Sequence, residues 1–118
     1  MDKAFHANIS VRIFGERKCF GPGVAELLRR VEEHHSLRGA AQSMEMSYSK
    51  AWTILHNAEE ELGFRLIDAR SGGKNGGGAL LTEDARRMLA AYERYCARLR
   101  EYGEEAFREE FSFLPNEG

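Results

Sequence analysis

The segment RSGGKNGGGALLT, residues 70–82, combines five of the chain's twelve glycines with two cationic side chains, Arg70 and Lys74. Glycine lets a backbone approach a ligand closely, and the two cations favour an anionic group such as phosphate. From these residues alone, a phosphate-binding loop, a flexible linker and the tip of a hairpin that lies against nucleic acid all remain open.

Other chemical interpretations of the sequence fail on spacing. The phosphate-binding loop of nucleotide hydrolases requires Ser or Thr after its Gly-Lys pair, and Asn75 stands there. His34 and His35 are adjacent on an expected helix and point in different directions, so no metal site is expected. No spacing typical of a nucleophile, base and acid occurs, and the acidic run at 59–61 suits a solvated helix face. We therefore expect a protein that is not an enzyme and needs no cofactor.

The size and composition suit one soluble domain. The 118 residues allow a modest core but not a second domain of similar size, so one domain is expected over residues 1–118. No apolar run has the length of a membrane span, and no signal-peptide pattern opens the chain. Cys19 and Cys96 lack a paired spacing, which favours reduced thiols in a cytoplasmic protein. The net charge of −2 does not by itself indicate a nucleic-acid binder, so the placement of the charges matters.

A short hairpin and a helix are expected first. Residues 9–14, ISVRIF, alternate apolar and polar side chains as a half-buried strand does, and residues 18–20, KCF, suit its partner. Pro22 suits the start of a helix, and the apolar residues after it recur at helical spacing to about His34.

Two further helical patterns follow in close succession. Ser36 is a suitable N-cap for a short helix over residues 37–44. Ser47 suits the N-cap of a third helix, which extends to about residue 62 because Gly63 stands where a C-terminal glycine belongs. Two helices joined by so short a turn form a helix-turn-helix.

The rest of the chain predicts a strand, a glycine loop, a second strand and a long helix. Residues 64–69 and 79–81 are expected to pair on either side of the glycine-rich loop. Thr82 suits the N-cap of a helix over residues 83–102, and the tail 103–118 is acidic and aromatic. The order of elements predicts a mainly α fold with a small β wing and an N-terminal hairpin. This is a winged helix-turn-helix with a long C-terminal dimerisation helix, and the glycine loop forms the tip of its wing.

Two segments resemble a known family. MSYSKAW (46–52) and RSGGKNGGGALLT (70–82) resemble the N-terminal DNA-binding domain of the molybdate-responsive ModE regulators, which pair SYxxAW in the recognition helix with a wing of the form GGKxGGGAxLT. SLRGAAQSM and AEEELG are similar to the helix-turn-helix of LysR-type regulators, and the resemblance covers residues 9–100. It implies a transcription regulator that binds double-stranded DNA. Members of the family that sense molybdate carry C-terminal oxyanion-binding domains, and this chain stops before one could begin, so molybdate is not expected to bind it.

DNA contacts are expected at two places on such a domain. A recognition helix reads base edges mainly through its N-terminal turns, while a wing contacts phosphates through cations and backbone amides. Trp52, carried over from the family motif, suits either a packing role or a DNA contact. Arg38 suits a phosphate contact or a free surface position. The expected DNA-binding residues are Arg38, Ser47, Tyr48, Ser49, Lys50, Thr53, Arg70, Ser71 and Lys74.

The last helix is expected to form a homodimer. Its apolar stripe is too broad for one small domain to bury, so part of it suits a two-fold partner helix. Such a dimer presents two recognition helices to a palindromic operator. We therefore expect a sequence-specific DNA-binding transcription regulator, with a link to molybdate metabolism implied by the resemblance. One alternative is a winged-helix protein-interaction module that does not bind DNA. Another is an isolated effector-responsive switch, in which a small oxyanion binds near the glycine loop.

Overall fold

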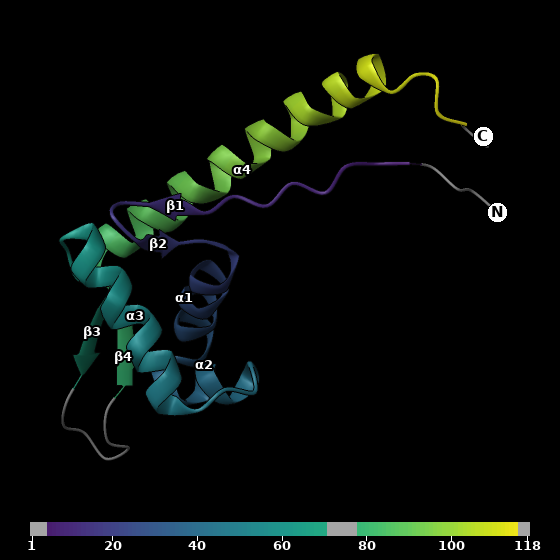
Figure 1. The fold of residues 1–118 in the computed structure, drawn as a ribbon. Coiled ribbons are helices and arrows are strands. Elements are labelled where there is room, and N and C mark those ends of the chain that lie inside the picture. Colours follow the sequence, from purple (N-terminus) through teal and green to yellow (C-terminus); the bar gives the residue numbers. More distant parts are fainter. Residues whose placement is uncertain (1–4, 71–77, 116–118) are drawn as a thin grey trace.

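The computed structural model describes residues 5–70 and 78–115, with the backbone alone for residues 69 and 70. Helices form most of the described chain, and each of two hairpins contributes a small antiparallel sheet (Figure 1). This architecture confirms the predicted winged helix-turn-helix with its long last helix. In chain order the elements are β1 (Ile13–Phe14), β2 (Lys18–Phe20), α1 (Pro22–His34), α2 (Leu37–Ser43), α3 (Tyr48–Leu62), β3 (Ile67–Arg70), β4 (Gly78–Leu81) and α4 (Glu83–Glu110).

Helix α1 lies at the centre of the domain. Its Leu27, Leu28 and Val31 side chains are fully buried and pack among residues from α2, α3 and the wing strand β4. At the end nearer α4, the Phe20 ring meets the Tyr92 ring edge-on, with 5.0 Å between their centroids. Burial of these apolar side chains is the main stabilising contribution to the arrangement of the three helices and the wing.

Three helix starts follow the capping residues expected from the sequence. The side chains of Ser36, Ser47 and Thr82 each accept the backbone N–H three residues further on, at 2.8, 3.1 and 2.9 Å. Gly63 ends α3 with a φ of 85°, in the left-handed region where glycine avoids the strain of a Cβ atom. These local signals set the starts of α2, α3 and α4 and the end of α3.

The predicted strand over residues 9–14 is wrong for residues 9–12. Only Ile13 and Phe14 pair with β2, and the register shifts between them. Because β2 has three residues, it offers no partner to the earlier part of the segment. That part runs alongside α4 instead (Figure 1), where the Val11 carbonyl accepts the Tyr92 hydroxyl at 2.8 Å.

The predicted end of the last helix near residue 102 is also wrong. Helix α4 continues to Glu110 and extends away from the rest of the domain (Figure 1). Gly103 does not end the helix. A Cβ atom at this position would lie 2.6 Å from Ile9 Cδ1, so the glycine gives the N-terminal segment room to pack. Of the helices that the structure describes, none is long and apolar enough to cross a membrane.

Candidate nucleic-acid interface

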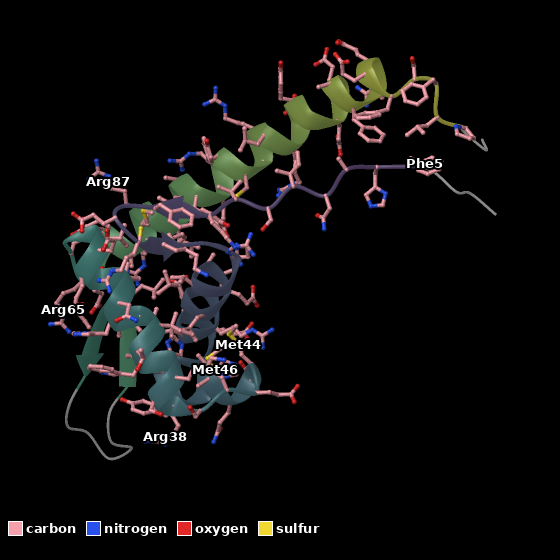
Figure 2. All side chains as sticks on the ribbon, viewed as in Figure 1. Phe5, Arg38, Met44, Met46, Arg65 and Arg87 are labelled. Atoms are coloured by element: carbon pink, nitrogen blue, oxygen red, sulfur yellow. The ribbon has the colours of Figure 1, made fainter. Side chains whose placement is uncertain are left out.

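A tight turn sets the direction of α3. The chain leaves α2 through Glu45, whose φ of 55° lies in the left-handed region, and the Met46 amide donates to the Ala41 carbonyl at 3.0 Å. Figure 2 shows Met44 and Met46 beside this turn, where both side chains pack against the core. The first turn of α3 therefore lies at the end of the domain away from α4 (Figure 1).

Five of the expected DNA-binding residues are exposed around this first turn. Ala51 and Leu55 face the core and Ile54 packs partly against it, whereas Trp52, Thr53 and the first residues of α3 are left at the surface. The exposed side chains offer hydroxyl, phenol and ammonium groups, which donate hydrogen bonds to phosphates or to base edges. They belong to Ser47, Tyr48, Ser49, Lys50 and Thr53.

Arg38 is placed next to this row by the cap of α2. Its guanidinium carbon lies 4.6 Å from the centroid of the Tyr48 ring, a cation–π contact between two exposed side chains. The contact links the start of α2 to the start of α3, and no hydrogen bond ties the guanidinium N–H groups to another described residue. Arg38 appears at the tip of this face in Figure 2.

Trp52 lies on the surface and not in the core. About half of the side chain is exposed, and its ring stacks on the His56 ring with 4.5 Å between centroids. The helical position explains this, because Trp52 follows the buried Ala51 by one residue and therefore points roughly 100° away from it. The sequence left a packing role and a DNA contact open for Trp52, and the structure does not place the side chain in the core.

The acidic run at the end of α3 holds other elements in place. One Glu59 carboxylate oxygen accepts the backbone N–H groups of Leu66 and Ile67, at 2.7 and 3.3 Å, and so fixes the start of the wing to the helix. Glu61 accepts the backbone N–H groups of Glu16 and Arg17 in the first hairpin. The sequence-based interpretation of residues 59–61 as a solvated face is therefore wrong for two of the three.

The Glu61 contacts change its acidity. Hydrogen bonds from the Arg17 and Glu16 amides, together with the charge of Arg17, hold the pKa of the Glu61 carboxyl below its ordinary value of 4.5. The Arg17 guanidinium lies 3.5 Å from the same carboxylate. Glu61 is thus a charged anchor between α3 and the first hairpin, and it lies at the opposite end of α3 from Ser47.

A groove of about 780 Å³ separates α3 from the wing. Its walls come from the end of α1, the start of α2, one side of α3 and both wing strands. The Ala79 amide donates to the His35 carbonyl at 2.9 Å and so fixes β4 against the end of α1. Sequence reasoning did not find this groove, because its walls come from four separate segments. The side chains at its rim include Arg38, Trp52, His56 and Arg65.

The base of the wing is described and its tip is not. Strands β3 and β4 pair from Ile67 with Leu81 to Arg70 with Gly78, so the backbone of Arg70 stands at the last described pair. The predicted contacts Ser71 and Lys74 lie outside the described residues. Among the residues that are described, no group of three or more His, Cys, Asp or Glu side chains is arranged to hold a metal ion.

A helix-turn-helix with an exposed, capped second helix and an adjacent wing defines the winged-helix class of DNA-binding domains. Residues 24–86, more than half of the chain, match the family described as bacterial regulatory helix-turn-helix protein, lysR family. The chain belongs to this family, and its domain is that of a DNA-binding transcription regulator.

Three relatives illustrate the similarity. The transcriptional regulator ModE of Haemophilus influenzae is 35% identical over 72 residues, which are 61% of this chain and 28% of the relative. The DNA-binding transcriptional dual regulator ModE of Escherichia coli is 28% identical over 88 residues, 74% of this chain and 34% of the relative. The molybdenum-pterin-binding protein MopA of Rhodobacter capsulatus is 30% identical over 86 residues, 73% of this chain and 32% of the relative. The matched region spans about a third or less of these relatives.

Proposed function

We propose that the chain binds a palindromic operator as a homodimer and regulates transcription from it. The first turns of α3 enter the major groove, and the wing follows the phosphate backbone beside it. The observation that carries this proposal is the exposed row at the start of α3, which Ser47 orients by capping the helix.

The distribution of charge supports DNA as the partner. The overall charge is −2, yet Lys50 lies in the first turn of α3, Arg38 of α2 lies beside it over the Tyr48 ring, and Arg65 lines the groove beside the wing. The acids of α3 lie at its other end, where Glu59 and Glu61 accept backbone hydrogen bonds. Phosphate contacts made by clustered cations give an affinity that falls steeply with salt concentration. This gathering of cations favours DNA binding over the alternative of a protein-interaction module.

The exposed part of α4 supports a homodimer. Its first turns bury Ala85, Leu89 and Tyr92 against the domain. Tyr95 and Tyr102, further along, are 53% and 72% exposed. A two-fold partner helix would cover these rings and would place two α3 helices about one helical turn of DNA, roughly 34 Å, apart.

The cellular setting follows from the partner. A regulator of bacterial transcription meets its operator in the cytoplasm, and we assign it no enzymatic role. The names of the relatives, which include a molybdenum-pterin-binding protein, motivate the further proposal that the regulated genes serve molybdenum metabolism. One domain over residues 1–118 remains our expectation for the organisation of the chain.

The test is selection from a pool of random duplex DNA, followed by sequencing. The Lys50→Ala, Lys74→Ala double variant is run beside the wild type. A matched control, Lys18→Ala with Arg87→Ala, removes two positive charges from exposed positions on β2 and α4, away from the start of α3. Figure 2 shows Arg87 on α4, at the end of the domain opposite Arg38.

We expect the wild type and the control to enrich one palindrome, and the Lys50, Lys74 variant to lose it. Folded wild-type protein that enriches no sequence, even at low salt, would overturn the proposal and favour a protein-interaction module. An enriched site without two-fold symmetry would contradict the homodimer alone.

A further inference from the structure

The groove between α3 and the wing holds an unusual share of the chain's histidines. Three of the four, His34, His35 and His56, line it. The His34 and His56 side chains are 38% and 46% exposed, so solvent and a ligand can both reach them. His35 takes the left-handed conformation, with φ of 56°, at the end of α1, and its carbonyl is tied to β4. The three residues come from two different elements, and only the fold brings them to one groove.

The groove also favours an anion. Arg38 and Arg65 supply permanent positive charge from the start of α2 and from the segment before β3. Among the described residues of its walls the one acid is Glu59, and a carboxylate oxygen of Glu59 already accepts two backbone N–H groups. The described wing residues in its walls, Ile67, Gly78 and Ala79, carry no side-chain charge.

Two more acids lie next to the histidines outside the groove walls. Glu33 approaches His34 at 3.5 Å, and Glu60 approaches His56 at 3.7 Å, in each case at the Nε2 atom. Both carboxylates are well exposed, at 76% and 56% of the side chain, so water and salt screen them strongly. They therefore leave the groove open to an anionic ligand.

We propose that this groove binds the phosphodiester backbone of double-stranded DNA through His34, His35, His56 and Arg65, and that protonation of the histidines strengthens the binding. The inference rests on the proposed function and names a further contact surface for it. The groove lies between the two elements expected on DNA, so a backbone strand that passes from the major groove at α3 to the wing crosses it. The Trp52 ring, stacked on His56, provides an apolar wall against which a sugar packs.

The chemistry gives the direction of the effect. A neutral imidazole offers one N–H donor, whereas the imidazolium offers two donors and a positive charge. DNA binds the protonated form better, so binding takes up protons and the affinity rises as the pH falls. Each added phosphate contact also steepens the dependence of log affinity on log salt by about 0.9, so three contacts steepen it by up to roughly 2.7.

The experiment measures fluorescence anisotropy of a labelled duplex of about 30 mixed-sequence base pairs, at pH values of about 6 and about 8 and at several salt concentrations. Mixed sequence suffices because phosphate contacts do not depend on the operator. The test protein is His34→Gln, His35→Asn, His56→Gln, in which Asn is chosen because it tolerates the left-handed conformation at position 35. His6→Gln is the matched control, since His6 lies against α4 outside this groove.

We expect wild type and His6→Gln to bind at least about tenfold more tightly at the lower pH, with a steeper salt dependence. The triple variant should lose most of the difference in affinity between the two pH values. Its affinity at both pH values should resemble that of the wild type at the higher pH. Circular dichroism of each variant checks the fold. If the triple variant unfolds, the single variant His56→Gln, at an exposed helix position, replaces it in the test. This single variant should lose part of the pH dependence of the affinity.

An unchanged pH dependence in the folded variants would overturn the inference and leave DNA binding intact. So would wild-type binding that is the same at both pH values. Folded wild-type protein that binds no duplex at either pH would overturn the proposed function itself, and the inference with it.

Discussion

Glu59 offers a direct test of how the wing is held against the recognition helix. Its carboxylate accepts the amides of Leu66 and Ile67, at 2.7 and 3.3 Å, where the chain enters β3. Glu59→Ala removes this acceptor and leaves two partly buried N–H groups without a protein partner. The adjacent Glu60 is exposed and accepts no backbone hydrogen bond from the described part of the chain; its carboxylate lies 4.0 Å from the Arg17 guanidinium and 3.7 Å from His56 Nε2.

The geometry sets the expected loss of stability. A hydrogen bond to a charged group contributes about 1.5–3 kcal/mol, and the bond to Ile67 is long and therefore at the weak end. With partial exposure taken into account, Glu59→Ala should lower the free energy of unfolding by about 2 kcal/mol. For a domain of this size that corresponds to a fall in Tm of about 8 °C. Glu60→Ala should cost less than about 0.5 kcal/mol, as exposed ion pairs do.

Urea unfolding followed by circular dichroism gives the free energy of unfolding of each variant, and thermal unfolding measured in parallel gives its Tm. The two variants remove the same charge from adjacent positions on the same helix, so their long-range effects on DNA are nearly equal. Glu59→Gln keeps a neutral acceptor and should lose about half as much stability as Glu59→Ala. We also expect Glu59→Ala to bind duplex DNA more weakly than Glu60→Ala, because the wing is no longer fixed to α3. Equal stability of Glu59→Ala and Glu60→Ala would refute the role given to Glu59.

Three further experiments test the cap, the first hairpin and the dimer. Ser47→Ala removes the acceptor for the Lys50 amide, so unfolding should become about 1 kcal/mol easier in denaturant titrations; Ser47→Asn, which can still cap, should lose much less. The lowered pKa of Glu61 means that its contribution to stability is present above the ordinary carboxyl pKa of 4.5 and is lost as the pH falls through the lower folded value. The Tm of Glu61→Gln should therefore depend less on pH over this acidic range than the Tm of the wild type. An equal pH dependence of the two Tm values would contradict the anchoring role of Glu61. Tyr95→Glu with Tyr102→Glu should shift the mass in light scattering from twice 13.4 kDa towards 13.4 kDa, because the two exposed rings would be covered in the dimer; an unchanged mass would place the dimer contact elsewhere.

The order of the elements could be predicted from the sequence because their signals are local. Ser36, Ser47 and Thr82 each cap a helix through a residue three positions away, and Gly63 ends α3 through its own backbone conformation. Hydrophobic spacing sets the buried side of α3, and so leaves the expected contact row at the surface. None of these features depends on the distant part of the chain.

The errors have the opposite origin. Residues 9–12 alternate as a strand does, yet β2 is too short to pair with them, and Tyr92 on α4 binds Val11 instead. The last helix is predicted to end at residue 102, yet it continues through Gly103, whose missing side chain makes room for Ile9, more than ninety positions earlier in the chain. Local propensity cannot show which distant segment will lie against a strand or a glycine.

The sequence by itself determined the helix-turn-helix, the presence of two wing strands and the residues at the start of α3, since caps, turns and periodicity act over a few residues. The predicted first wing strand, residues 64–69, is wrong for residues 64–66, because β3 begins only at Ile67, where Glu59 holds the backbone amides against α3. Only the tertiary structure decided what Glu59 and Glu61 do, because their partners are backbone amides of the wing and the first hairpin. It alone also brought the histidines at the end of α1 to the same groove as His56 on α3. Such contacts form when the burial of apolar side chains packs α1, α3 and the wing together, and no spacing along the chain encodes them.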